Sequence, residues 1–229
     1  MRKLAIVGYG KMGKLIEQLA PEYGFEVAIK LDEFNNIGGA GFTAANFSGV
    51  DAAIEFSIPS AVPANVEGVS RLGVPLVVGT TGWLEHLDRV KQTIAANDGG
   101  LVWSPNFSIG VNVFFKLVAE AARLLSEEPA YGSWAWEIHH SAKKDAPSGT
   151  LLKLVDEMKK AGYARNIDVG SNRAGTIPGT HEIGFDSAAD TITLRHTARS
   201  REGFARGALK AAAWLAGKKG FYEFSEIEF

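Results

Sequence analysis

The first twenty residues constrain the fold more than any other part of the chain. A short apolar strand, residues 3–7, runs directly into a glycine-rich loop, and apolar positions at helical spacing follow that loop. In such a strand–loop–helix unit, the first glycine permits a tight turn, the second lets the backbone approach a pyrophosphate, and the third lets helix and strand pack closely. The pattern predicts a Rossmann-like unit that binds a dinucleotide through Gly8, Tyr9, Gly10, Lys11, Met12 and Gly13.

The second predicted strand, residues 25–31, ends at an acidic side chain. Asp32 lies about 20 residues past the glycines, where a carboxylate accepts hydrogen bonds from the adenosine ribose. The alternative is a Rossmann-like domain that has lost its ligand, with Asp32 a solvated loop residue. The order of strand, glycine loop, helix, strand and acid favours dinucleotide binding.

Strand and helix patterns continue to alternate as far as about residue 107. Strands are predicted over 51–57, 75–78 and 101–103, and helices over 61–72 and 84–96. This alternation predicts a doubly wound parallel sheet, whose ligands bind at the carboxyl ends of its strands. Two polar loops fall at such ends, so we expect cofactor contacts from Gly79, Thr80, Thr81, Ser104, Pro105, Asn106 and Phe107, although either loop alone is also compatible with an ordinary turn.

The second half of the chain has a different pattern. A helix is predicted over 111–125, a strand over 134–140, a helix over 151–160, and a hairpin of strands 181–185 and 191–196. These elements predict an α+β domain with a mixed open sheet. A last amphipathic helix, residues 204–215, is expected to pack back on the first domain. The predicted domains are therefore 1–107 completed by 204–229, and 108–203.

Residues 137–150 concentrate the polar chemistry of the second domain. Two histidines, a lysine and a predicted helix start lie within this segment, which equips it to protonate and hold a small polyanion. Without further information, a His-His pair is more often structural, Ser148 an ordinary N-cap, and the lysines solvated. Successive strand residues point to opposite faces, so His139 and His140 are not expected to share a metal ion, and no metal is predicted.

Composition narrows the class of protein. The formal net charge of −2 gives no global attraction for polyanions, so an anionic ligand requires a local cluster of positive groups, and no nucleic-acid partner is expected. The absence of cysteine excludes thiol nucleophiles, disulfides and thiolate metal sites. No apolar run approaches the roughly 18 residues that span a bilayer, so we expect no membrane association and a cytoplasmic protein.

The segment from Glu137 to Thr150 closely resembles the signature of the dihydrodipicolinate reductase family, E-x-H-H-x-x-K-x-D-A-P-S-G-T. Other segments match that family in order along the whole chain: the glycine loop, residues 79–82, residues 105–108 with 110–112, residues 173–175 with 179–181, and residues 196–201 with 204–208. The chain departs from the family in its compact glycine loop and its short connection from Asp32 to Asp51.

The resemblance implies that NADH or NADPH delivers a hydride to a cyclic unsaturated dicarboxylate, on the pathway to diaminopimelate and lysine. It implies catalytic roles for His139 as the general acid and for Lys143, and a homotetramer assembled through the second domain, for which Trp134 and Trp136 offer apolar surface. Substrate-binding residues implied by the match are Thr81, His140, Lys143, Ser148, Gly149 and Thr150.

The residues after the second strand bear on the choice of cofactor. NADPH adds a phosphate beside the adenosine ribose, and proteins that favour it usually place a cation there. In this chain Asp32 is followed by Glu33 and Phe34, and the nearest cations are Lys11 and Lys30. We therefore expect a preference for NADH with some residual use of NADPH.

Two other classes of protein share some of these features. A dehydrogenase acting on a different amino or hydroxy dicarboxylate, such as aspartate, would share the glycine loop but not residues 139–150. A redox-sensing regulator would need a basic, exposed element for DNA or a protein partner, and no predicted helix carries one.

Overall fold

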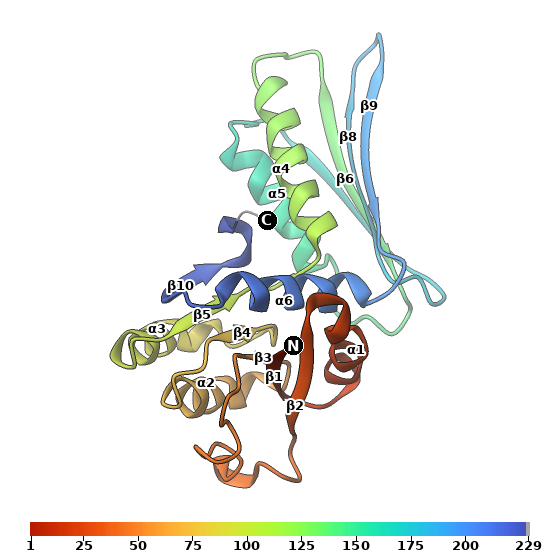
Figure 1. Ribbon diagram of the computed structural model, residues 1–229. Coiled ribbons are helices and arrows are strands. Elements are labelled where there is room, and N and C mark those ends of the chain that lie inside the picture. Colours follow the sequence, from red (N-terminus) through yellow and green to blue (C-terminus); the bar gives the residue numbers. More distant parts are fainter. Residues whose placement is uncertain (228–229) are drawn as a thin grey trace. The chain divides into compact units, whose positions relative to one another are not determined.

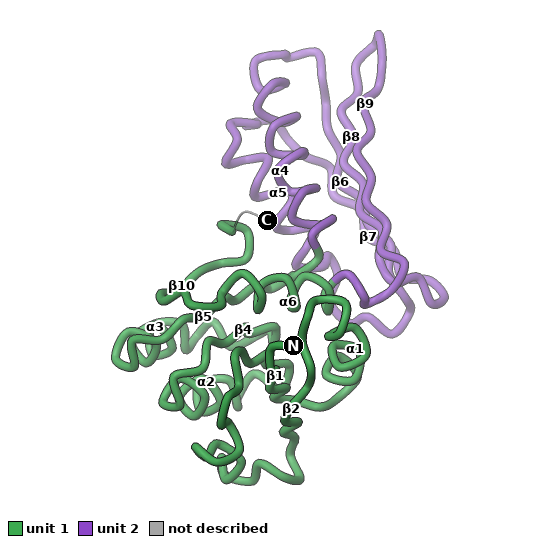
Figure 2. The backbone as a smooth tube through the Cα atoms, viewed as in Figure 1, with its two compact units in different colours: residues 1–108, 204–229 green, residues 109–203 purple. Residues whose placement is uncertain are grey.

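The computed structural model describes residues 1–227, and they form two compact units (Figures 1 and 2). Unit 1 combines residues 1–108 with the C-terminal segment that begins at Phe204, and unit 2 comprises residues 109–203. Each unit has its own sheet, of six strands in unit 1 and four in unit 2. No helix among the described residues is both long enough and apolar enough to cross a bilayer.

Unit 1 is built on a wholly parallel sheet with the order β10-β5-β4-β3-β1-β2. The strands are β1 (Arg2–Val7), β2 (Phe25–Leu31), β3 (Ala52–Glu55), β4 (Leu76–Val78), β5 (Gly100–Trp103) and β10 (Gly220–Glu223). Because β1 pairs with β2 on one side and β3 on the other, the strand order reverses at β1. Ligands of doubly wound sheets bind beside such a reversal, at the carboxyl ends of the strands.

Helices cover both faces of this sheet. They are α1 (Lys11–Leu19), α2 (Val62–Ser70), α3 (Leu87–Ala96) and α6 (Glu202–Leu215), with 3-10 turns η1 (Ala20–Tyr23), η2 (Ile37–Gly39), η3 (Pro59–Ala61), η4 (Leu84–His86) and η5 (Phe224–Glu226). On one face, Val66 of α2 and Val90 of α3 share a core with Val7 of β1. On the other, Ile6 is fully buried, and Gly13 of α1 lies so close that a Cβ there would be 3.1 Å from the Ile6 side chain.

Unit 2 is a four-stranded mixed sheet with two helices on one face. Its elements are α4 (Ile109–Leu124), β6 (Gly132–His139), α5 (Gly149–Lys160), β7 (Ile167–Arg173), β8 (Thr180–Asp186) and β9 (Thr191–Thr197), and the strand order is β7-β6-β8-β9. Phe114 of α4 and Leu154 of α5 pack with Ala135 of β6 in one core. Since side chains alternate along a strand, Glu137 and His139 share the face of Ala135 and are buried, whereas Trp134 and Trp136 lie on the opposite face.

The predicted fold class, a doubly wound parallel sheet with an α+β companion, is confirmed, with three local differences. Strands β7 and β10 were not predicted, because Ile167–Arg173 is mostly polar without apolar alternation and Gly220–Glu223 is only four residues long. The helix predicted over 84–96 begins as the 3-10 turn η4 and becomes α-helical at Leu87. Finally, β6 ends at His139, so His140 lies outside the strand.

Candidate active site

A cavity of about 390 Å³ lies beside the glycine loop of unit 1. Its walls come from the loop after β1, the end of β2 and the segment after β3: Val7, Gly8, Tyr9, Gly10, Leu31, Asp32, Glu33, Phe34, Asn36, Phe56, Ser57, Ile58, Ala61 and Asn65. Four predicted cofactor residues, Gly8, Tyr9, Gly10 and Asp32, are thus brought together around one cavity. Lys11, Met12 and Gly13 form the first turn of α1 and do not line it.

The glycine loop fits a pyrophosphate. Gly8 has a φ of +95°, and a Cβ there would lie 2.1 Å from the carbonyl oxygen of Phe56. A Cβ on Gly13 would lie 2.5 Å from the carbonyl oxygen of Gly8, whereas one on Gly10 would meet nothing within 4 Å. Gly8 and Gly13 therefore permit close backbone packing, and Gly10 borders open space next to the first N–H groups of α1, which have no partner within the helix.

The acidic end of the cavity is ordered by local hydrogen bonds. Asp32 Oδ1 accepts hydrogen bonds from the N–H groups of Phe34, at 2.9 Å, and Asn35, at 3.2 Å. The Phe34 ring is 80% exposed although it lines the cavity. Lys30 Nζ is 2.9 Å from Glu17 Oε1 and 5.0 Å from the centre of the Tyr9 ring, and the Tyr9 hydroxyl donates to the same carboxylate. Lys30, the lysine nearest to Asp32 in the sequence, is therefore paired with Glu17.

Behind the cavity wall lies a buried carboxyl group that the sequence did not indicate. Glu55 is fully buried at the end of β3, and its Oε1 accepts hydrogen bonds from the N–H of Ser57 at 3.0 Å and from Asn65 Nδ2 at 3.3 Å. Burial raises the pKa of Glu55, against the effect of these hydrogen bonds. Thr80 Oγ1 accepts from the Ser57 N–H at 2.7 Å, so Thr80 supports the wall without lining the cavity.

The other loop residues predicted to touch the cofactor do not line the cavity. Phe107 is 2% exposed, and its ring centre is 4.8 Å from that of Phe224, which makes it a core residue. Ser104 Oγ accepts from the Asn106 N–H at 3.0 Å, which closes a tight turn. Gly79 lies against the Phe56 ring, where a Cβ would be only 2.1 Å away. Thr81 and Pro105 are exposed.

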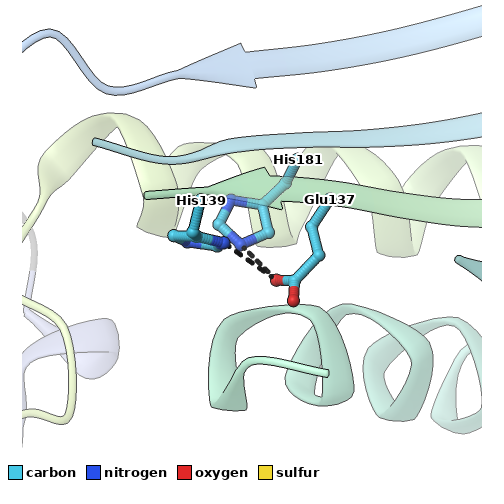
Figure 3. Close-up of side chains that lie close together, drawn as sticks. All are labelled: Glu137, His139 and His181. Carbon is cyan, nitrogen blue, oxygen red and sulfur yellow. Dashed lines mark ion pairs between the residues drawn. The ribbon is translucent and has the colours of Figure 1, made fainter. Parts of the chain in front are cut away.

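Unit 2 places Glu137 against two histidines that lie side by side, His139 of the same strand and His181 of the neighbouring strand β8 (Figure 3). Glu137 Oε2 is 3.4 Å from His139 Nδ1 and 3.3 Å from His181 Nε2. All three residues are buried, at 0% exposure for Glu137, 7% for His139 and 5% for His181. His181 therefore lies directly against the carboxylate next to the predicted acid.

Hydrogen bonds keep the Glu137 carboxylate ionised in this buried position. Oε1 accepts from the Ser148 N–H at 2.8 Å, from Ser171 Oγ at 2.7 Å and from Arg173 Nη2 at 2.9 Å, and Oε2 accepts from the Ser148 hydroxyl. Although burial opposes ionisation, these donors lower the pKa of Glu137 to about 2. The cluster therefore has a permanent negative charge, paired with the guanidinium of Arg173.

Burial lowers the pKa of both imidazoles beside Glu137. Burial, reinforced by His139, lowers the pKa of His181 to about 4. Burial also lowers the pKa of His139, but the Glu137 carboxylate opposes that effect. One ligand atom from each of the three residues lies within 4.8 Å of the others, so the cluster has the donor set of a metal site. Arg173 already supplies the positive charge that a metal ion would bring to this carboxylate.

The remaining residues of the predicted substrate site lie in the loop after β6 and at the start of α5. Lys143 Nζ bonds to both carboxylate oxygens of Asp145, at 2.8 and 2.9 Å, and the Lys143 N–H donates to the carbonyl of His140. Ser148 is the N-cap of α5 and accepts from the Leu151 N–H at 3.2 Å. Because Ser148 also donates its N–H and hydroxyl to Glu137, the first N–H groups of α5 that remain for an anion are those of Gly149 and Thr150.

Comparison with family models covers almost the whole chain. Residues 2–107 match the model described as "Dihydrodipicolinate reductase, N-terminus", and residues 110–227 match "Dihydrodipicolinate reductase, C-terminus". The chain is 34% identical over 236 residues to a 4-hydroxy-tetrahydrodipicolinate reductase of Christiangramia forsetii, covering 98% of this chain and 96% of that protein. It is also 34% identical, over 262 residues, to the protein of the same name from Ralstonia nicotianae, with 98% of each chain covered.

Solved structures show the same fold. A dipicolinate-bound dihydrodipicolinate reductase from Paenisporosarcina sp. TG-14 is 23% identical and superposes with a TM-score of 0.80 over 100% of both chains. An aspartate dehydrogenase from Thermotoga maritima, 12% identical, covers 100% of this chain and 99% of its own with a TM-score of 0.52. Dehydrogenases with other substrates therefore share the architecture, and the family model separates this chain from them.

Proposed function

The chain belongs to the dihydrodipicolinate reductase family, and on that premise we propose that it reduces 4-hydroxy-tetrahydrodipicolinate, or the dihydrodipicolinate formed from it, to tetrahydrodipicolinate on the route to diaminopimelate and lysine. The relatives named above are 4-hydroxy-tetrahydrodipicolinate reductases, and family models match residues 2–107 and 110–227. The observation that carries the proposal is the buried His139 beside Glu137, at the head of a segment rich in anion-binding groups.

The cavity of unit 1 is the proposed cofactor site. A bound NADH or NADPH supplies the hydride. Gly10 and the start of α1 hold the pyrophosphate through backbone N–H groups, because the space beside Gly10 is open and helix N-termini favour anions. Asp32 also lines the cavity, and a carboxylate after the second strand accepts hydrogen bonds from a ribose.

Unit 2 supplies the groups that bind and protonate the substrate. A hydride adds to a conjugated carbon only when the displaced electron density is met by a proton, and His139 is the proposed donor of that proton. His140 and Lys143 are the proposed partners of one substrate carboxylate. The N–H groups of Gly149 and Thr150 are the proposed partners of the other, since the start of α5 favours an anion. Thr81 of unit 1 remains a proposed additional substrate contact.

The activity assay is oxidation of NADH, followed by its absorbance. Purified protein is expected to oxidise NADH only after addition of the fresh condensation product of pyruvate and aspartate semialdehyde. Oxaloacetate with ammonium serves as the control substrate, because an amino-acid dehydrogenase of similar fold would reduce that mixture. Oxidation with the control substrate, and none with the condensation product, would refute the proposed reaction.

We expect the enzyme to prefer NADH, with some residual use of NADPH. Asp32 and Glu33 both line the cavity, and two carboxylates repel a 2′-phosphate, while Lys30 is held by Glu17 at 2.9 Å. The expected ratio of kcat/KM for NADH over NADPH is about tenfold or more, since each 1.4 kcal/mol changes the ratio tenfold. Steady-state kinetics with both cofactors at one ionic strength measure it.

A kcat/KM that favours NADPH by tenfold would contradict this preference and would mean that Lys11 or Lys30 outweighs the two acids. Lys11→Ala identifies the source of residual NADPH use, because Lys11 is exposed at the start of α1. This substitution is expected to lower kcat/KM for NADPH while leaving that for NADH within about twofold, as expected for loss of one exposed charge.

We also propose that the protein is a homotetramer assembled through the sheet of unit 2. Trp134 and Trp136 lie on the sheet face opposite the helices, and small residues leave room for their rings: a Cβ on Gly184 would be 2.0 Å from Trp134, and one on Gly170 would be 3.1 Å from Trp136. Both indoles are only half-buried in the single chain. Aromatic residues at this exposure are common in subunit interfaces. Sedimentation velocity measures the stoichiometry, and a monomer at micromolar concentration would refute it.

A further inference from the structure

The two ring nitrogens of His139 face different surroundings. Nδ1 is buried, makes no hydrogen bond to the described residues, and lies 3.4 Å from Glu137 Oε2. Nε2 faces Gly179, where a Cβ would lie 2.8 Å from it, so the glycine keeps that nitrogen free of an overlying side chain. One nitrogen therefore faces a carboxylate, and the other faces a residue that has no side chain.

The hydrogen bonds of Glu137 leave one acceptor position open. Each oxygen of a carboxylate offers about two lone-pair directions. Three donors already bond to Oε1, namely the Ser148 N–H, Ser171 Oγ and Arg173 Nη2. The Ser148 hydroxyl bonds to Oε2, so the remaining acceptor direction of Oε2 is the one available to the histidines.

The hydroxyl of Ser148 determines which nitrogen of His181 carries the hydrogen. Its hydroxyl hydrogen is given to Glu137, so toward His181, 3.2 Å away, Ser148 Oγ acts as an acceptor. His181 must then carry its hydrogen on Nε2, which lies 3.2 Å from Ser148 Oγ and 3.3 Å from Glu137 Oε2. With a pKa lowered to about 4 by burial, His181 stays neutral and keeps this arrangement above that pH. The single hydrogen of His181 Nε2 is shared between Ser148 and Glu137, so Glu137 Oε2 also remains within reach of His139 Nδ1, which makes no hydrogen bond to the described residues.

We propose that Glu137 is a positioning residue for His139: its Oε2 accepts the Nδ1 hydrogen, so that Nε2 is the atom that gives its proton to the substrate. The inference rests on the proposed function in that His139 is the general acid. A contact of 3.4 Å is long for a hydrogen bond, and contacts of this kind often shorten only when substrate binds. Carboxylates fix the tautomer and stabilise the charged form of histidine in the same way in other enzymes.

The charged groups around His139 shift its pKa in both directions. Burial lowers the pKa of His139; Glu137 and Asp145 raise it, and Lys143 and Arg173 lower it. The neutral ring of His181 lies 5.0 Å from that of His139, centre to centre. A general acid works in its protonated form, so the rate falls as pH rises through this pKa. Removing the Glu137 charge must move that fall to lower pH.

Glu137→Gln is the informative substitution because it replaces the acceptor that faces His139 with a donor. The Ser148 hydroxyl, which donates to the same oxygen, must then turn to accept. The Oε1 position must still accept from Ser148, Ser171 and Arg173, so the amide nitrogen takes the Oε2 position and presents a donor to His139 Nδ1. Neutral His139 is then expected to switch to the Nε2–H tautomer. The Nδ1 atom of His139, which then faces an N–H donor, is also harder to protonate.

The direct test is nitrogen NMR of protein labelled with ¹⁵N in its five histidines, with the His139 signals assigned by their loss in His139→Gln. In the wild type, neutral His139 is expected to carry its hydrogen on Nδ1, and in Glu137→Gln on Nε2. Asp156→Asn, an exposed substitution on α5, is the matched control and should leave the His139 signals unchanged. Wild-type His139 with its hydrogen on Nε2 would overturn the inference, even if Glu137→Gln fails to fold.

The pH dependence of kcat gives an independent readout. In Glu137→Gln the midpoint of the fall in kcat is expected to move down by about one pH unit, and kcat at pH 7.5 to fall about tenfold, as for loss of one opposite charge at close range. The KM for substrate should stay within about twofold. An unshifted midpoint would refute the positioning role. If His139→Gln keeps full activity while Glu137→Gln still changes the tautomer of His139, then His139 is not the general acid, although Glu137 does position its ring.

Discussion

His139→Gln is expected to lower kcat by about 10²-fold or more, because general acid catalysis contributes about 10² to 10⁴. Glutamine keeps much of the volume of the buried ring but has no proton to give near neutral pH. The cavity proposed for the cofactor is lined only by residues of unit 1, so the Kd for NADH should not change. Stopped-flow single turnovers measure the chemical step, and fluorescence titration measures the Kd.

The matched control for this prediction is His86→Gln. His86 is a partly exposed histidine of the η4 turn that pairs only loosely with Glu85, at 3.5 Å. It should keep wild-type kcat, because it belongs neither to the cavity nor to the Glu137 cluster. A His139→Gln variant with unchanged single-turnover rate would remove His139 from the mechanism.

Lys143→Ala is expected to raise the substrate KM and lower kcat, with a loss in kcat/KM of about 10²-fold. Truncating one partner of a desolvated, hydrogen-bonded charge pair, such as the proposed pair of Lys143 with a bound substrate carboxylate, costs about 2–5 kcal/mol. Lys143 Nζ bonds to the two carboxylate oxygens of Asp145, at 2.8 and 2.9 Å. We expect a substrate carboxylate to take the place of Asp145 as its partner. A charge that binds substrate in both ground and transition states affects both constants.

Lys143→Arg distinguishes charge from geometry in this position. Arginine keeps the positive charge but has a wider, planar head group, so partial activity with a raised KM is expected. Steady-state kinetics over a wide range of substrate concentration decide the question. Normal saturation and normal kcat in Lys143→Ala would contradict the proposed role.

The parallel sheet could be predicted because its strands are apolar runs separated by amphipathic helices. β2, over Phe25–Leu31, has the predicted bounds, and β4 and β5 differ from the predicted ranges by one residue. β7 was missed since its side chains are mainly polar, and its position is fixed by pairing with β6, from Ser133–Ile167 to His139–Arg173. Hydrophobic periodicity reveals a strand that has one buried face. It gives no signal for a polar strand that is held by pairing with its neighbour.

The site was predictable where its residues are close in sequence. Gly8, Gly10 and Asp32 line one cavity, and residues 139–150 form one loop and helix start. The partners of Glu137 were not predictable, because Ser171, Arg173 and His181 come from other strands and meet it only through strand pairing. Ser148, which stays a proposed substrate contact, also donates two hydrogen bonds to Glu137 that the sequence did not predict.

The most direct test of the account is the transfer of label from cofactor to product. Enzyme is supplied with the fresh condensation product of pyruvate and aspartate semialdehyde and with NADH doubly deuterated at C4 of the nicotinamide. Mass spectrometry of tetrahydrodipicolinate should show one deuterium per molecule in ordinary water, because the hydride comes from the cofactor and the accompanying proton from solvent through His139. Oxidation of the deuterated NADH without deuterium in the product, or no oxidation at all, would contradict the account.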